Sequence, residues 1–159
     1  AYISLQLLKY IKGRNLEIYL PGHFTPIHGK IISMDPFSST IEDIFGNKIY
    51  IANSLLINAI VKEYLPSIRL RLTLKIRENM DPREVIESVM DVFNKSDVYT
   101  FRIHESQVEI EMIKNDKIVL SLYATPLSMP VRVSDIIRLA RHLTMNLKEY
   151  DPMIEIVKT

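Results

Sequence analysis

The stretch IRLRLTLKIR, residues 68–77, alternates apolar and polar side chains without a break. Isoleucine or leucine occupies every second position. The positions between them hold Arg69, Arg71, Thr73, Lys75 and Arg77. Because successive side chains of a strand point to opposite faces of its sheet, this spacing predicts a strand that is buried on one face and solvated on the other. The second half of the chain is therefore expected to contain a sheet with a basic outer face.

A helix is predicted shortly after this strand. Asp81, Pro82 and Glu84 stand in the order of an N-cap, a proline at the first helical position and an acid at the third. Apolar residues then recur at helical spacing as far as Phe93. Beyond it, apolar or alternating runs predict three strands, at residues 98–104, 107–113 and 117–124.

A second helix and a last strand complete this half. Ser134 and Asp135 can cap the helix. Its predicted apolar stripe comprises Ile136, Ile137, Ala140, Leu143 and Leu147. Residues 154–157 predict the closing strand. The order strand, helix, three strands, helix, strand is a ferredoxin-like α/β plan with one extra strand, and we expect it to span residues 67–159.

Pro66 marks the boundary with the first half, because proline halts strand pairing. Residues 15–66 contain four or five short strands joined by tight turns, which predicts a small five-stranded β-barrel. The chain as a whole is thus expected to be α+β. Residues 2–11 are mostly apolar, and their spacing fits a helix or a strand equally.

The composition excludes several classes of function. The 159 residues carry 20 lysines and arginines against 19 acids, so no overall charge attracts nucleic acid. The chain has no cysteine, which excludes disulfides, thiolate zinc sites and cysteine nucleophiles. Its four glycines are too scattered for a phosphate-binding loop. No uncharged stretch reaches the about 20 apolar residues of a membrane-spanning helix. Because the first residue is Ala1, we expect the sequence to be part of a longer chain.

No set of residues predicts a metal or catalytic site. His23 and His28 flank one predicted loop, but their spacing matches no known pair of metal ligands. The other two histidines stand apart from any serine or acid that would complete a triad. Glu109 and Glu111 share one face of a predicted strand and could act as an acid pair, although solvated carboxylates are the commoner case. We expect no enzyme and no cofactor.

The basic row on residues 68–77 could bind an anion or pair with acids. In a ferredoxin-like sheet the first strand pairs with the third, which we assign to residues 107–113. Glu109 and Glu111 are then expected opposite Arg69 and Arg71, and an ion-paired face is favoured.

Residues 27–64, IHGKIISMDPFSSTIEDIFGNKIYIANSLLINAIVKEY, resemble the β-domain of the small-conductance mechanosensitive channel family. That family has a glycine before a strand, a strand with threonine, an aspartate–glycine turn, and a strand ending in asparagine before an apolar run. The corresponding residues here are Gly29, Thr40, Asp43 with Gly46, and Asn53 with Ser54. Ala52 stands where the family usually has proline.

The resemblance implies an Sm-like barrel followed by the ferredoxin-like domain, in the cytoplasmic vestibule of a channel in the cell membrane. Such a region forms a homo-oligomer, typically a heptamer, filters solutes below the pore and hangs from a membrane helix upstream of this chain. Residues 1–14 would leave that helix, with Lys9, Lys12 and Arg14 near the lipid headgroups. The chamber would be lined by Arg69, Arg71, Lys75, Arg77, Glu109 and Glu111. No catalysis, nucleic acid or small-molecule substrate is implied.

An Sm-like RNA-binding or scaffolding protein is the alternative. A five-stranded barrel with Asp35, Gly46 and Asn47 in its turns could also bind RNA. The near-neutral charge argues against this function, because phosphate contact needs a concentrated basic patch. An enzyme of unfamiliar type would rest only on the unassigned histidines and acids.

Overall fold

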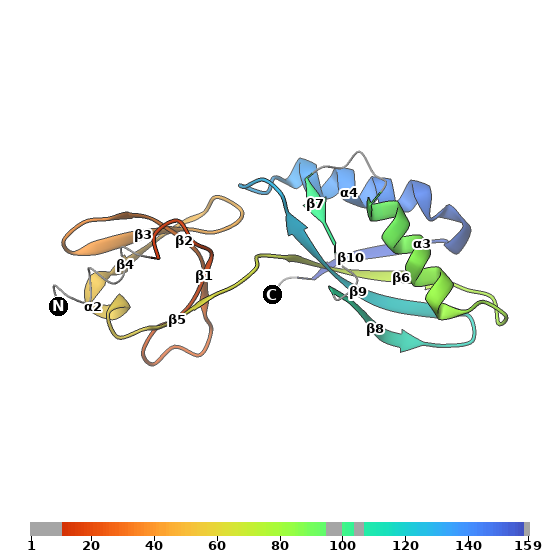
Figure 1. Ribbon diagram of the computed structural model, residues 1–159, viewed down its shortest axis with the longest axis horizontal. Coiled ribbons are helices and arrows are strands. Elements are labelled where there is room, and N and C mark those ends of the chain that lie inside the picture. The colour runs from red at the N-terminus through yellow and green to blue at the C-terminus, as the bar shows by residue number, and fades with distance from the viewer. Residues whose placement is uncertain (1–10, 95–99, 104–106, 158–159) are drawn as a thin grey trace. The chain divides into compact units, whose positions relative to one another are not determined.

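The computed structural model describes residues 11–94, 100–103 and 107–157, which divide into two compact units (Figure 1). The first unit extends to Pro66 and includes Met129–Val131, and the second comprises Ser67–Ser128 and the residues from Arg132 onward. Each unit contains an antiparallel sheet of five strands, which confirms the predicted α+β class. Most of the predicted segment 1–14 lies outside the described residues. Within the described ranges, no helix is both long and apolar enough to cross a membrane.

The first unit contains five strands and one short helix. In chain order these are β1 (Leu16–Tyr19), β2 (Ile27–Met34), β3 (Ser38–Glu42), β4 (Lys48–Ala52), α2 (Asn53–Leu56) and β5 (Ile60–Glu63). The strands lie in the order β4-β3-β2-β1-β5, and every neighbouring pair is antiparallel. Buried apolar side chains of these elements form one core, made of Leu16, Ile18, Leu20, Ile31, Ile41, Ile51 and Leu56.

The predicted closed barrel is wrong for this sheet. Closure needs hydrogen bonds between the edge strands β4 and β5, and the described residues show no such pairing. The chain leaves β4 through α2 and returns at the opposite edge, where β5 pairs with β1 and Glu63 lies opposite Leu16. The first unit is therefore an open sheet with two free edges in the described part of the chain.

The second unit contains five strands and two long helices. In chain order these are β6 (Ile68–Lys75), α3 (Pro82–Asn94), β7 (Phe101–Arg102), β8 (Val108–Ile113), β9 (Lys117–Pro126), α4 (Val133–Asn146) and β10 (Met153–Val157). A 3-10 turn at Lys148–Tyr150 precedes β10. β6 lies between β10 and β9, while β7 and β8 both pair with β9. Phe101 of β7 lies opposite Pro126 and Val108 of β8 opposite Leu122, so the predicted extra strand is a two-residue strand that shares its partner with β8.

One expected strand pairing is wrong. β6 pairs with β9 and β10 rather than with β8, so Arg71 lies opposite Ser121 on one side and Glu155 on the other. The reason is that β7 and β8 together take the place of the second strand of the ferredoxin-like plan, since both pair with β9. β9 then takes the place of the third strand, which pairs with the first.

The strand predicted from residues 68–77 is confirmed as half-buried. Its apolar side chains Ile68, Leu70, Leu72 and Leu74 are at most 5% exposed. α3 and α4 lie on one side of the sheet (Figure 1), and they bury Val85, Val89, Phe93, Leu139 and Leu143. Ile137, predicted in the buried stripe of its helix, is 47% exposed instead, because Leu139 and Leu143 define the line that is buried.

The two long helices begin with different caps. Asp81 caps α3 as predicted, since its Oδ1 accepts the backbone N–H of Arg83 at 3.0 Å. α4 begins at Val133, so Ser134 lies inside the first turn and does not cap it. The carboxylate of Asp135 accepts the backbone N–H of Arg132 at 2.9 Å, which satisfies one of the donors at the start of the helix.

Candidate functional site

The outer face of the second sheet carries the basic side chains of β6. Arg69, Arg71 and Lys75 point away from the helices because the leucines between them point toward the helices. β9 adds Ser121 opposite Arg71, and Tyr123 opposite Arg69. The Arg69 guanidinium lies 5.8 Å from the centre of the Tyr123 ring, within cation–π range.

Glu111 of β8 contacts three of these side chains at once. Its Oε1 lies 2.6 Å from Nη2 of Arg69, and its Oε2 lies 2.9 Å from Nε of Arg71. The hydroxyl of Ser121 donates to Oε1 as well. The register of β8 against β9 shifts at Glu111, which marks a bulge, and a bulge re-aims the side chain that it carries. Glu111 thereby reaches across β9 to β6.

These donors hold the pKa of Glu111 far below its ordinary range, from 4.5 to about 2. The hydrogen bond from Ser121 is the largest cause, followed by the hydrogen bond from Arg71, and burial opposes both. Hydrogen bonds to the ionised form favour that form. Glu111 is therefore a carboxylate at neutral pH and at mildly acidic pH.

Two further acids neutralise the rest of the row. Oε2 of Glu155 lies 3.7 Å from Nη1 of Arg71, and Oδ2 of Asp151 lies 2.9 Å from Nζ of Lys75. The hydrogen bond to Asp151 raises the pKa of Lys75, with the negative charge of that residue as the next cause. Arg69, Arg71 and Lys75 are thus each paired, and the face is a mixed-charge network rather than an open basic patch.

The structure brings together only part of the predicted charged set. Arg69, Arg71 and Glu111 meet, whereas Glu109 lies 3.4 Å from the hydroxyl of Tyr123 and Arg77 follows the end of β6. Sequence reasoning missed three members of the network, namely Ser121, Glu155 and Asp151. The single polar residue in the apolar run of β9 was the available signal for Ser121, but the two acids depend on how β10 pairs.

Two glycines of the resemblance motif occupy tight backbone positions. A Cβ atom on Gly29 would lie 2.6 Å from the carbonyl oxygen of Glu42 on the neighbouring strand, which no side chain tolerates. Gly46 has a φ of +85°, in the left-handed region that glycine favours. It lies in a turn where Oδ1 of Asp43 accepts the backbone N–H groups of Phe45 and Asn47, each at 2.9 Å.

Asn53 is the most buried polar member of that motif, at 5% exposed. Its Oδ1 accepts the Ser39 hydroxyl at 2.6 Å, and its Nδ2 donates to the backbone oxygen of Asp35 at 2.7 Å. Its backbone N–H donates to the oxygen of Phe37 at 2.8 Å. Asn53 therefore ties the start of α2 to β3 and to the turn before it.

The remaining motif residues lie nearer the surface. Thr40 is a partly buried residue of β3 and lies opposite Tyr50 of β4. Ser54 is exposed in α2, where its backbone oxygen accepts Nδ2 of Asn58 at 3.3 Å.

The predicted membrane-proximal basic residues lie near the start of the described chain. Nη1 of Arg14 lies 2.6 Å from Oε1 of Glu63, in an exposed ion pair. Lys12 is exposed, and Lys9 lies outside the described residues.

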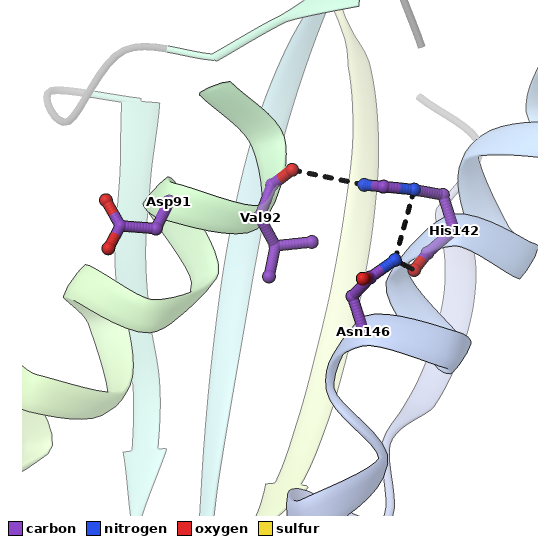
Figure 2. Close-up of a pocket in the computed structure, with 4 residues that line it drawn as sticks. All are labelled: Asp91, Val92, His142 and Asn146. Atoms are coloured by element: carbon purple, nitrogen blue, oxygen red, sulfur yellow. Dashed lines mark hydrogen bonds between the residues drawn. The ribbon is translucent and has the colours of Figure 1, made fainter. Parts of the chain in front are cut away.

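A shallow pocket of ≈ 270 Å³ lies between α3 and α4 and is lined by Asp91, Val92, His142 and Asn146. Figure 2 shows the ring of His142 directed at the backbone of Val92, with Asp91 directed away from it. Nε2 of His142 lies 3.1 Å from the oxygen of Val92, which can only accept, so Nε2 carries the proton. Nδ1 then accepts from Asn146 at 3.2 Å. Both ring nitrogens are satisfied, which favours a helix-to-helix link over a catalytic role.

The histidines do not assemble a metal site in the described ranges, where no three histidines or acids are grouped around a possible ion. Nε2 of His28 lies 3.8 Å from Oε2 of Glu17, and the His28 ring packs on the ring of Tyr64. His23 is exposed. His104 lies outside the described residues.

No protein-family model and no curated protein matches the chain. Several solved structures match it in fold. The MscS of Helicobacter pylori in its closed state is 17% identical, with a TM-score of 0.49, and the match covers 99% of this chain and 60% of that one. Wild-type MSL1 of Arabidopsis thaliana is 10% identical, with a TM-score of 0.51 and coverage of 99% and 54%. A further Arabidopsis MSL1 structure is 10% identical, with a TM-score of 0.48 and coverage of 99% and 56%.

The chain therefore matches the fold of wild-type Arabidopsis MSL1 over 99% of its length. It spans somewhat more than half the length of the chains it matches. The resemblance found in residues 27–64 is confirmed at the level of the fold.

Proposed function

We propose that this chain forms the cytoplasmic vestibule of a mechanosensitive-type ion channel in the cell membrane and carries out no catalysis. The observation that carries the proposal is the likeness of fold to wild-type Arabidopsis MSL1, at a TM-score of 0.51 over 99% of the chain. The motif in residues 27–64 supports it independently, because that resemblance also implies a β unit followed by an α/β unit.

In this account the chain assembles as a homo-oligomer, a heptamer in the full-length channel. Residues 15–66 form the β-domain, and the free edges of β4 and β5 join neighbouring copies edge to edge. Residues 67–159 form the ferredoxin-like domain. Residues 1–14 leave an upstream membrane helix, which places Lys12 and Arg14 near the headgroups.

The charged sheet face is proposed as the lining of the chamber that filters solutes. Its network of Arg69, Arg71, Glu111 and Glu155 presents both signs of charge, held rigidly by the paired side chains. A rigid face of mixed charge suits a filter that is not strongly selective for one sign. No ion pair joins Arg77 or Glu109 to another described residue, and these two would face solutes directly.

The test is a chimera in which this chain replaces the matched 54% of Arabidopsis MSL1. We expect the chimera to form an oligomer in the membrane and to pass current when tension is applied. The matched control is the same protein with the chain deleted. Absence of current from a chimera that is folded and inserted would contradict the proposal.

RNA binding, the alternative from the sequence, gains no support from the charges. Arg14, Arg69, Arg71 and Lys75 are each paired with a carboxylate, so the basic row of β6 is not a concentrated patch of unpaired cations for phosphates.

A further inference from the structure

The exposed faces of α3 and α4 carry opposite charges. On α3, Glu84 and Glu87 lie three residues apart and share one exposed face. On α4, Arg138 and Arg141 have the same spacing and are also exposed. Both helices lie on the same side of the second sheet (Figure 1). A pair of exposed acids on α3 and a pair of exposed arginines on α4 therefore occur on one layer of the unit.

These four side chains make no ion pair with any other residue that the structure describes. By contrast, Arg69, Arg71 and Lys75 on the opposite face of the sheet are each paired with an acid. The helix dipole stabilises the negative charge of Glu84, which lies in the first turn of α3. The dipole of α4 does not stabilise the charges of Arg138 and Arg141, since both residues lie before its last turn.

The exposed side of α4 that carries the arginines also carries large apolar side chains. Val133 is 73% exposed, Ile137 47% and Met145 65%. These residues and Arg141 recur every four positions, so they form one line about 18 Å long along the helix. Ile86 and Met90 are half-buried beside the acids of α3 and offer an apolar counterpart. A line of exposed apolar side chains with arginines at its side is typical of a protein interface.

We propose that α4 of one copy of this chain docks on α3 of a neighbouring copy, with Arg138 and Arg141 against Glu84 and Glu87. Because both pairs share a rise of about 4.5 Å, two ion pairs can form together. The contact covers Val133, Ile137 and Met145. It joins different surfaces of the two copies, so it can repeat around a closed ring. This inference rests on the proposed homo-oligomer and names one of its contacts.

Charge reversal of the isolated 159-residue chain tests this contact by sedimentation velocity over a concentration series. We expect Glu87→Arg alone and Arg141→Glu alone to weaken self-association roughly tenfold each, because each places like charges together. The double variant should recover the association of the parent to within about threefold. Glu78→Arg and Lys114→Glu, at exposed positions outside the helices, serve as matched controls.

A parent chain that stays monomeric throughout the series would overturn the contact, as would single variants that associate like the parent or a double variant that fails to recover. These outcomes leave the vestibule proposal standing if the chimera still passes tension-activated current. Recovery in the double variant together with a silent chimera would support the contact and contradict the vestibule proposal.

Discussion

The side chain of Asn53 links separate segments of the first unit. Its amide satisfies the buried Ser39 hydroxyl and the backbone oxygen of Asp35. Asn53→Ala would leave both groups without partners, and we expect it to lower the free energy of unfolding of the first unit by about 2 kcal/mol. Urea denaturation measures this change.

The neighbouring substitution Ser54→Ala is the matched control, because Ser54 is exposed and its side chain has no hydrogen bond among those described. It should change stability by less than about 0.5 kcal/mol. Equal effects of the two substitutions would show that the amide of Asn53 is not what joins these segments.

Glu111 makes the stability of the second unit depend on pH. Its pKa is lowered from 4.5 to about 2, so its interactions stabilise the folded chain fully above pH 4.5 and are lost as the pH falls through about 2. Glu111→Gln should therefore be less stable than the parent at neutral pH. It should also lose less stability than the parent between pH 4.5 and about 2.

Urea titrations at stepped pH give both curves. Glu109→Gln is the control, since among the described residues Glu109 contacts just the hydroxyl of Tyr123, at 3.4 Å, and the stability of this variant should change with pH as that of the parent does. Parallel profiles for the parent and Glu111→Gln would refute the role assigned to this carboxylate.

At the scale of the element, α3 depends on its cap. Asp81 accepts the backbone N–H of Arg83, one of the donors that have no partner inside the helix. Asp81→Ala should cost about 1 kcal/mol, and Asp81→Ser should restore most of it because serine is also a good N-cap. The measurement is the midpoint of thermal unfolding, and a serine variant as unstable as the alanine variant would contradict the capping role.

The elements themselves were predictable where the signal is local. The alternation in residues 68–77 determined β6 and its two faces, and Asp81 with Pro82 determined the start of α3. Pairing was less predictable, because it depends on segments far apart in the chain. The bulge that directs Glu111 across β9 has no mark in the sequence. Ile137 was misassigned because its apolar character does not show which side of the helix is buried: it lies about 200° around the helix from the buried Leu139.

At the scale of the whole chain, the α+β class was predictable and the closure of the first sheet was not. Five short strands fit a barrel or an open sheet equally, and the choice depends on whether the edges β4 and β5 meet. In the vestibule proposal these edges are covered by neighbouring copies, and the α3–α4 contact joins the second units. In both cases a surface that has no partner within one chain is covered by a neighbouring copy in the oligomer.

The current through the MSL1 chimera under increasing membrane tension tests the central claim most directly. The account predicts a conductance that rises with tension in patches with the intact chimera and is lost when this chain is deleted. A folded, inserted chimera that passes no current, or a current that does not change when the chain is deleted, would contradict it.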